Sequence, residues 1–347
     1  MPLGSSSTSW FPATFGFEEL SFSDTRKQFT IDEANILTSK STGQSFLVGP
    51  FECLSTNELR IRLQQLNKAD RALGPATFHN IADNVRSLHQ DPKNSGALFQ
   101  VASQFNCLEM VGPSISPQDG ISRYSRDPTQ GPACALACPA ATLFRNYFVS
   151  GHGQAKKQLD LLDEAAQILQ NDKYGYWDMM NGYCLPRTTQ SMAQIGASLS
   201  LAPDLASAVR SAIKVGVHWN TEVANHQHQV CQVFCSALPV AYSKATPSSD
   251  WEPFATLVLE AAYECTLAVA SYLALQRGQR VTVYLTCLGG GAFGNRVQWI
   301  LKALSRALLV YQDSPLDIKL VHFMRNPSSD FVSLEKRFVK RSVKNNR

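Results

Sequence analysis

The segment Leu288-Gly289-Gly290-Gly291-Ala292-Phe293-Gly294-Asn295 decides the fold, because it connects a β-forming run to a helix-forming run. Residues 281–285 before it are rich in β-formers, and residues 297–309 after it carry apolar side chains at helical spacing. Such a glycine-rich turn is typical of phosphate sites, since glycines let backbone N–H groups approach an anion and the helix N-terminus adds partial positive charge. The alternative is that the glycines serve only the close packing of the strand against the helix.

The same segment argues against two common classes of nucleotide-binding protein. It contains no Gly-Lys-Ser or Gly-Lys-Thr, which argues against a P-loop NTPase. It also lies near the C-terminus and not after the first strand, which argues against a Rossmann dinucleotide site. A second β-like run at 318–323 completes a strand, helix and strand, so we expect an α/β fold.

The composition is that of a folded protein with room for one large α/β domain or two smaller ones, at 347 residues, 44% hydrophobic and 17% charged. The chain shows no uncharged apolar run of 18 residues and no basic-then-apolar leader, so we expect neither a membrane span nor a signal peptide. Its nine cysteines are scattered without a Cys-x-x-Cys pair. We therefore expect reduced thiols and a cytoplasmic location, with a nuclear one also compatible.

The net charge of +4 comes from the C-terminus. Residues 335–347 hold six basic residues and one acidic residue, or +5, which leaves about −1 for the rest of the chain. We interpret this segment as a solvated, frayed tail. Nucleic-acid or anionic-surface contact is the alternative for the tail alone, since nothing in the body of the chain supports it.

The pattern of turns and periodic segments divides the chain into four parts. We expect a disordered leader at 1–9, an N-terminal β-rich extension at 10–93, an α/β domain at 94–327 and the basic tail at 328–347. Within these parts we expect a hairpin around Gly43, a helix at 78–89, a strand at 145–149, a helix-plus-hairpin insert at about 151–203, and a long helix at 250–276.

Four motifs lie between residues 97 and 325: Gln104-Phe105-Asn106, Thr129-Gln130-Gly131-Pro132, Arg145-Asn146-Tyr147-Phe148 and the segment at 289–295. With these motifs, residues from about 97 to 325 resemble a macrodomain, a fold that binds ADP-ribose, and more specifically a little-characterised family of macrodomain-like proteins. The resemblance implies a three-layer α/β/α mixed sheet. Two features depart from a standard macrodomain. The loop at 129–132 is not a triple-glycine run followed by an acid, and the insert at 151–203 is long. Both departures disfavour hydrolysis more than nucleotide binding.

The resemblance also implies roles for individual residues. Asn106 would bind the proximal ribose, and Glu109 or Asp127 would act on water as an acid or base. The alternatives are a strand-end hydrogen bond for Asn106, an ion pair for Glu109 and a turn for Asp127. Ligand contacts are also expected from two loops, with plain turns as the alternative; their residues are Gln130, Gly131, Gly289, Gly290, Gly291, Ala292, Phe293, Gly294 and Asn295. Phe293 would stack on a ribose or anchor its loop, and Asn295 would contact the ligand or cap the following helix.

The sequence thus predicts a protein that binds ADP-ribose or a related nucleotide diphosphate, with hydrolysis of ADP-ribosyl linkages as an open possibility and an ADP-ribosylated protein as a partner. The alternative is a non-catalytic reader or scaffold that uses the N-terminal unit and the insert for protein contacts. We expect no cofactor and no metal, because the group His218, His226, His228, Cys231 and Cys235 fits no zinc spacing.

Overall fold

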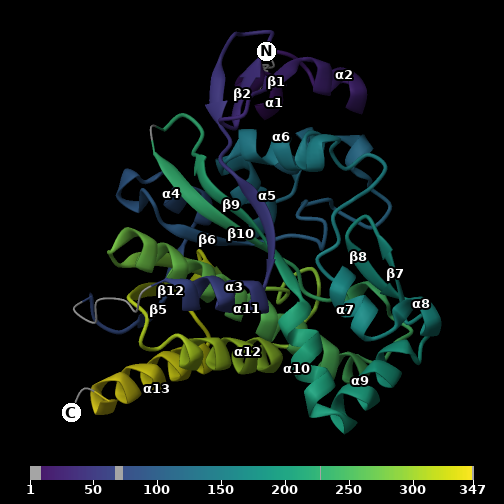
Figure 1. Ribbon diagram of the computed structural model, residues 1–347, viewed down its shortest axis with the longest axis vertical. Coiled ribbons are helices and arrows are strands. Elements are labelled where there is room, and N and C mark those ends of the chain that lie inside the picture. Colours follow the sequence, from purple (N-terminus) through teal and green to yellow (C-terminus); the bar gives the residue numbers. More distant parts are fainter. Residues whose placement is uncertain (1–8, 67–72, 227, 346–347) are drawn as a thin grey trace, which may run out of the picture.

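The computed structural model describes residues 9–66, 73–226 and 228–345, with side chains as far as residue 340. Its centre is a seven-stranded mixed sheet of order β4-β9-β10-β6-β11-β12-β5 (Figure 1). Strands β10, β6, β11, β12 and β5 are parallel, and β9 is antiparallel to both β10 and β4. The strands are β4 (Phe51–Ser55), β5 (Thr77–Asp83), β6 (Leu98–Ala102), β9 (Lys214–Glu222), β10 (Gln229–Cys235), β11 (Val281–Thr286) and β12 (Leu316–Phe323).

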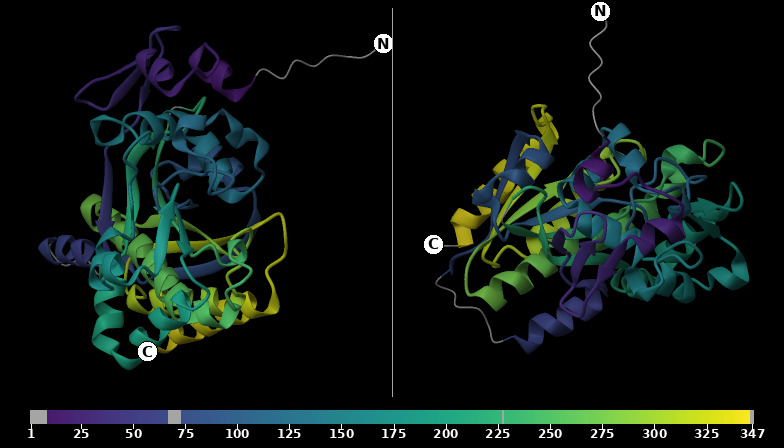
Figure 2. Two further views of the ribbon diagram at one scale, coloured as in Figure 1. Left: turned by 90° about the vertical axis from the view of Figure 1, so that its right-hand side faces the viewer. Right: turned by 90° about the horizontal axis from the view of Figure 1, so that it is seen from above.

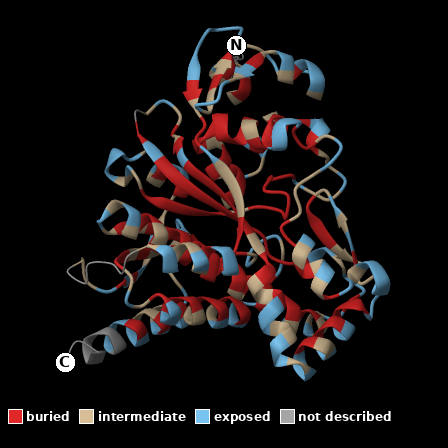
Figure 3. Ribbon diagram, in the orientation of Figure 1, coloured by how far each residue is buried: buried red, intermediate tan, exposed pale blue. Residues whose placement is uncertain are grey.

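One face of the sheet is covered by a helical layer built around α11 (Ser248–Arg277). This helix is buried along most of its length because α3, α9, α10 and α12 pack around it (Figure 3). It is long and apolar enough to cross a membrane, but 89% of its most apolar window is buried inside the protein, as in a core helix. Its neighbours are α3 (Thr56–Gln65), α9 (Ser191–Leu201), α10 (Pro203–Ala212) and α12 (Val297–Val310).

The other face is covered by α4 (Val85–Gln90), α5 (Gln130–Ala137) and α6 (Pro139–Tyr147). The His89 ring of α4 stacks on Phe99 of β6, with ring centroids 3.6 Å apart. The Arg145 guanidinium of α6 lies 3.7 Å from the ring centroid of Phe234 on β10. The predicted three-layer α/β/α mixed sheet is therefore confirmed.

A second core joins the N-terminal unit to this helical layer. Phe11 and Phe15 of the unit are buried in one cluster with Leu143 and Tyr147 of α6. Figure 1 and the left view of Figure 2 place the unit beyond α6, at the end of the molecule away from α13 (Ser329–Asn345). The unit consists of α1 (Trp10–Phe15), α2 (Phe22–Lys27), β1 (Phe29–Ile31), β2 (Ile36–Ser39) and β3 (Ser45–Leu47).

The insert at 151–203 contains two short helices and a hairpin before it enters α9. Its elements are α7 (Asp163–Ile168), α8 (Asn171–Tyr174), β7 (Trp177–Met180) and β8 (Tyr183–Pro186). The predicted hairpin turn at Asn181-Gly182 is confirmed, as are the hairpin around Gly43 and the long helix. The predicted leader at 1–9 lies, apart from Ser9, outside the described residues.

Three predictions about secondary structure are wrong. Residues 78–89 are not one helix, because 77–83 pair with β12 and the side chain of Asn84 then caps α4. Residues 145–149 are not a strand, because Pro139 starts a helix that runs to Tyr147. The described part of the basic tail forms α13, because Phe331, Leu334 and Phe338 give it an apolar face that is buried with Phe78 of β5.

The predicted boundary at 93/94 also cuts through the large sheet. Strands β4 and β5 belong to the predicted extension, yet β4 pairs with β9 and β5 pairs with β12. Among the described residues of the predicted extension, only those before β4 form a separate small sheet, of order β1-β2-β3.

Candidate functional site

Three loops meet where the parallel strands β6, β10 and β11 end. They are residues 103–109, 236–242 and 287–296, which we call the β6 loop, the β10 loop and the glycine loop. The Ser103 N–H donates to the Cys235 carbonyl over 2.9 Å, and the Ala241 N–H donates to the Phe293 carbonyl over 3.0 Å. Carboxyl ends of parallel strands are where ligands bind in open α/β sheets.

Two of the four loop glycines are required by packing. Gly289 and Gly294 both have φ of +72°, and a Cβ on Gly289 would lie 2.5 Å from the Ala237 Cβ. Gly291 has neither constraint, since its φ is not positive and a Cβ there would meet no atom within 4 Å. Close packing therefore explains Gly289 and Gly294 but leaves Gly291 without a structural reason.

The spacing of these glycines is Gly-x-Gly-x-x-Gly, counted from Gly289 through Gly291 to Gly294. Spacing alone therefore does not separate this loop from a dinucleotide-binding loop. Its position does separate them. The loop follows β11, the fourth of the five parallel strands along the chain (β5, β6, β10, β11 and β12), whereas a Rossmann loop follows the first strand of its unit.

The tip of the glycine loop has three backbone donors that are not used within the fold. Among the residues that the structure describes, the N–H groups of Gly291, Ala292 and Phe293 donate no hydrogen bond. The next two N–H groups are used inside the loop, since Gly294 donates to Gly291 and Asn295 donates to Gly289. Gly291 and Ala292 are exposed and Phe293 is half-buried, so a ligand can reach this row of donors.

Asn295 fastens the glycine loop and does not cap the helix that follows. Its Nδ2 donates to the Leu238 carbonyl over 2.9 Å, and α12 begins after Arg296 without a side-chain cap. The predicted capping role is therefore wrong. The Oδ1 atom of Asn295 is buried and has no donor among the described residues, which leaves one acceptor open beside the loop.

Phe293 of the glycine loop packs in an aromatic cluster that the sequence did not predict. The Phe293 ring lies 5.4 Å from Tyr183 of the insert and 5.6 Å from Tyr242 of the β10 loop, centroid to centroid. Tyr183 is buried, and its hydroxyl donates to the Met110 carbonyl over 2.6 Å. Tyr242 is 37% exposed and offers an accessible ring at the rim. Phe293 thus has the contacts of a loop anchor, and its predicted ribose contact stays a prediction.

Asn106 is enclosed by the insert. Its Nδ2 donates to Gln158 Oε1 over 2.8 Å, and its Oδ1 accepts from the Leu108 N–H over 3.1 Å. Gly182, at the tip of the insert hairpin, packs so closely that a Cβ there would lie 2.6 Å from Asn106 Oδ1. The side chain is fully buried, so it does not face solvent in this conformation.

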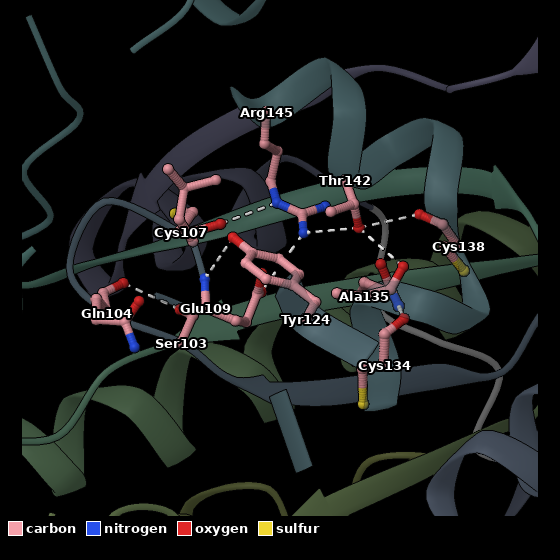
Figure 4. A network of polar contacts seen from close by, with 12 residues as sticks. Ser103, Gln104, Cys107, Glu109, Tyr124, Cys134, Ala135, Cys138, Thr142 and Arg145 are labelled. Carbon is pink, nitrogen blue, oxygen red and sulfur yellow. Dashed lines mark hydrogen bonds and ion pairs between the residues drawn. The ribbon is translucent and has the colours of Figure 1, made fainter. Parts of the chain in front are cut away.

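Glu109 belongs to a buried polar network with Arg145 and Tyr124 (Figure 4). The Glu109 N–H donates to the Tyr124 hydroxyl over 3.0 Å, and Glu109 Oε1 lies 3.5 Å from Arg145 Nη2. Burial raises the pKa of Glu109 to about 7, and the nearby Arg145 only partly offsets this rise. The predicted ion pair is therefore present but long, and the Glu109 side chain is 1% exposed.

The segment that leads into α5 uses its polar groups within the fold. Asp127 is half-buried, and its Oδ1 accepts from the Thr129 N–H over 2.9 Å. The Gln130 amide accepts from the Ala102 N–H and donates to the Gln100 carbonyl, both over 2.8 Å, and so pairs with β6 as a strand would. A Cβ on Gly131 would collide with the Ala102 carbonyl oxygen, which accounts for this glycine.

Among the described residues, no group of three or more His, Cys, Asp or Glu side chains is placed to hold a metal ion. Two surface hollows, with volumes of about 310 and 420 Å³, lie beside the N-terminal unit. Neither is lined by the glycine loop.

No protein-family model matches this sequence, and no curated protein matches it. Among solved structures it is similar to poly(ADP-ribose) glycohydrolase from Thermomonospora curvata, at 11% identity over 91% of this chain and 94% of that one, with a TM-score of 0.43. The same enzyme bound to the inhibitor ADP-HPD gives 10% identity over the same shares and a TM-score of 0.42. The poly(ADP-ribose) glycohydrolase from Deinococcus radiodurans in complex with ADP-ribose gives 9% identity over 84% of this chain and 94% of that one, with a TM-score of 0.43.

Identities and TM-scores this low assign neither a ligand nor a reaction to this chain. Membership of the macrodomain-like family stays a prediction.

Proposed function

We propose that this protein binds ADP-ribose or a related nucleotide diphosphate at the glycine loop. The observation that carries the proposal is the row of unpaired N–H groups on Gly291, Ala292 and Phe293, at the carboxyl ends of β6, β10 and β11. Consecutive backbone donors of this kind bind anions. The N-terminus of α12, a helix of 14 residues, follows the loop directly and adds partial positive charge.

Two further features support a nucleotide over a bare anion. Lys244 and Arg296 are exposed on the segments that flank the aromatic cluster, where their charges favour a doubly charged diphosphate. The exposed part of Tyr242 offers an aromatic surface for a ribose or a base.

Calorimetric titration of the variant Gly291→Val tests this proposal. A valine side chain would stand over the donor row, while the open space around Gly291 leaves the fold intact. We expect wild type to bind ADP-ribose with a Kd in the micromolar range, about −8 kcal/mol, and the variant to lose at least tenfold in affinity. The control is Lys336→Ala on the outer face of α13, which should bind as wild type does. Equal affinity of Gly291→Val and wild type would remove the loop from the binding site.

A non-catalytic reader of ADP-ribosylated protein is favoured over a hydrolase by one specific observation. Glu109, one of the two predicted acid or base residues, and Asn106, the predicted ribose ligand, are both buried and are held by hydrogen bonds or an ion pair within the fold. A general acid or base has to come within hydrogen-bonding reach of the proton that it transfers.

Assays on an ADP-ribosylated protein separate the reader from the hydrolase. We expect wild type to bind this protein without releasing ADP-ribose. Release by wild type that disappears in Glu109→Gln or Asp127→Asn would instead establish the hydrolase. In that case the insert hairpin has to move away from Asn106 during the reaction.

A further inference from the structure

Two cysteines from distant parts of the chain, Cys53 and Cys107, lie next to each other beside Gly216 of β9. Cys53 on the edge strand β4 lies directly opposite Gly216 on β9. A Cβ on Gly216 would lie 2.5 Å from the Sγ of Cys107, so the Cys107 thiol occupies the space that a side chain at 216 would fill. Directly opposed Cβ positions in an antiparallel pair are about 4.5–5.5 Å apart. The Cys107 thiol therefore lies beside the Cys53 side chain.

The backbone of the β6 loop fixes Cys107 in this position. Its φ of +59° is rare for a residue with a side chain. Its N–H donates to the Gln104 carbonyl and its carbonyl accepts from Arg145 Nε, each over 2.9 Å (Figure 4). Cys107 is fully buried, whereas Cys53 is partly exposed. The pair thus has one accessible and one enclosed thiol.

The surroundings give the two thiols different reactivity. A hydrogen bond from the Cys107 thiol lowers the pKa of Cys53, with a smaller effect of the Lys214 charge, and together these exceed the opposing effect of burial. Burial raises the pKa of Cys107. Since the thiolate is the attacking species, Cys53 is the nucleophile of the pair. Cys287 is the other partly exposed cysteine among the described residues, and burial raises its pKa to about 12.

We propose that Cys53 is a site of thiol–disulfide exchange with a low-molecular-weight disulfide such as glutathione disulfide, and that Cys107 resolves the product. In the first step the Cys53 thiolate attacks one sulfur of glutathione disulfide, forms a mixed disulfide and releases a glutathione thiolate. In the second step Cys107 attacks the Cys53 sulfur and its proton passes to the second glutathione, which leaves as a thiol. The two protein thiols lose two electrons, and glutathione disulfide is reduced to two glutathione molecules.

The disulfide would tie the β6 loop to the edge of the sheet. Cys107 stands between Asn106 and Glu109, so the bond would fix the segment that forms one wall of the candidate site. This inference does not depend on the proposed function, because the exchange is detected without a nucleotide.

The experiment treats the folded, full-length protein with glutathione disulfide and maps the cysteine peptides by mass spectrometry. We expect a Cys53–Cys107 linkage in wild type that dithiothreitol reverses. In Cys107→Ala we expect glutathione to accumulate on Cys53, because no thiol remains to displace it. In Cys53→Ala we expect Cys107 to stay unmodified, because it is buried.

Cys287 is the matched control, since it is partly exposed like Cys53 but its pKa is raised. Wild type treated briefly with iodoacetamide near neutral pH should be alkylated at Cys53 at least tenfold faster than at Cys287. This comparison uses wild type alone, so it holds even where a cysteine variant fails to fold. Equal alkylation rates, absence of the linkage, or a stable glutathione adduct on Cys53 of wild type would each overturn the proposal.

Discussion

At the scale of single residues, glycines that the fold needs can be told from glycines that it does not need. Gly131 presses against the Ala102 carbonyl oxygen, and Gly291 stands in open space. We expect Gly131→Ala to lower the free energy of unfolding by about 1–3 kcal/mol, as overpacking does. Gly291→Ala should change it by less than about 0.5 kcal/mol. Urea unfolding of both variants checks this, and equal losses would mean that Gly291 also has a packing role.

Glu109 gives the protein a pH dependence of stability whose sign can be worked out. Its folded pKa of about 7 lies above the ordinary value of 4.5, so the folded state holds this proton more tightly than the unfolded chain. The stability that the protonated carboxyl contributes is fully present below pH 4.5 and is lost as the pH rises through about 7. The difference in unfolding free energy between wild type and Glu109→Gln should therefore shift against wild type from pH 5 to pH 7.5. A difference that stays constant over this range would show that Glu109 is ionised throughout.

At the scale of elements, α13 packs against the edge strand β5 of the sheet. Phe331 is buried, while Lys336 on the same helix is exposed. Phe331→Ala should cost about 3–5 kcal/mol of stability, and Lys336→Ala should be neutral within about 0.5 kcal/mol. Denaturant midpoints of the two variants measure this contrast. If Phe331→Ala left stability unchanged, the C-terminal segment would instead be the solvated tail that the charge pattern predicts.

The elements also show what the sequence could and could not predict. The glycine loop, α11 and α12 were predictable because each has a local signature, either a cluster of glycines or a sustained apolar period. The strand β5 was not, because its partner β12 lies more than 230 residues further along the chain. Pairing over such a distance overrides local propensity.

The candidate site was predictable only in part for the same reason. The donors at 291–293 follow from the local sequence. The covering of Asn106 by Gly182 and the contacts of Phe293 with Tyr183 and Tyr242 arise only when the insert folds back onto the β6 loop.

At the scale of the whole molecule, the N-terminal unit and the large sheet are tied into one body. The Glu19 carboxylate accepts from the N–H groups of Ile121 and Ser122 and from the Tyr147 hydroxyl, over 2.6–2.8 Å. We expect heat unfolding to give one calorimetric transition in which the calorimetric and van't Hoff enthalpies agree. We also expect Glu19→Ala to lower stability by about 1–3 kcal/mol, since it leaves these donors without their acceptor. Two separate transitions would instead support an independent N-terminal domain.

The central claim is that the glycine loop binds a nucleotide diphosphate. The most direct test is calorimetric titration of wild type with ADP-ribose, with ADP, NAD and AMP as comparators. The structure predicts micromolar binding of ADP-ribose and at least tenfold weaker binding of AMP, which lacks the second phosphate for the donors at 291–293. No heat of binding with any of the four, at protein concentrations that would detect a Kd of 100 µM (about −5.5 kcal/mol), would contradict it.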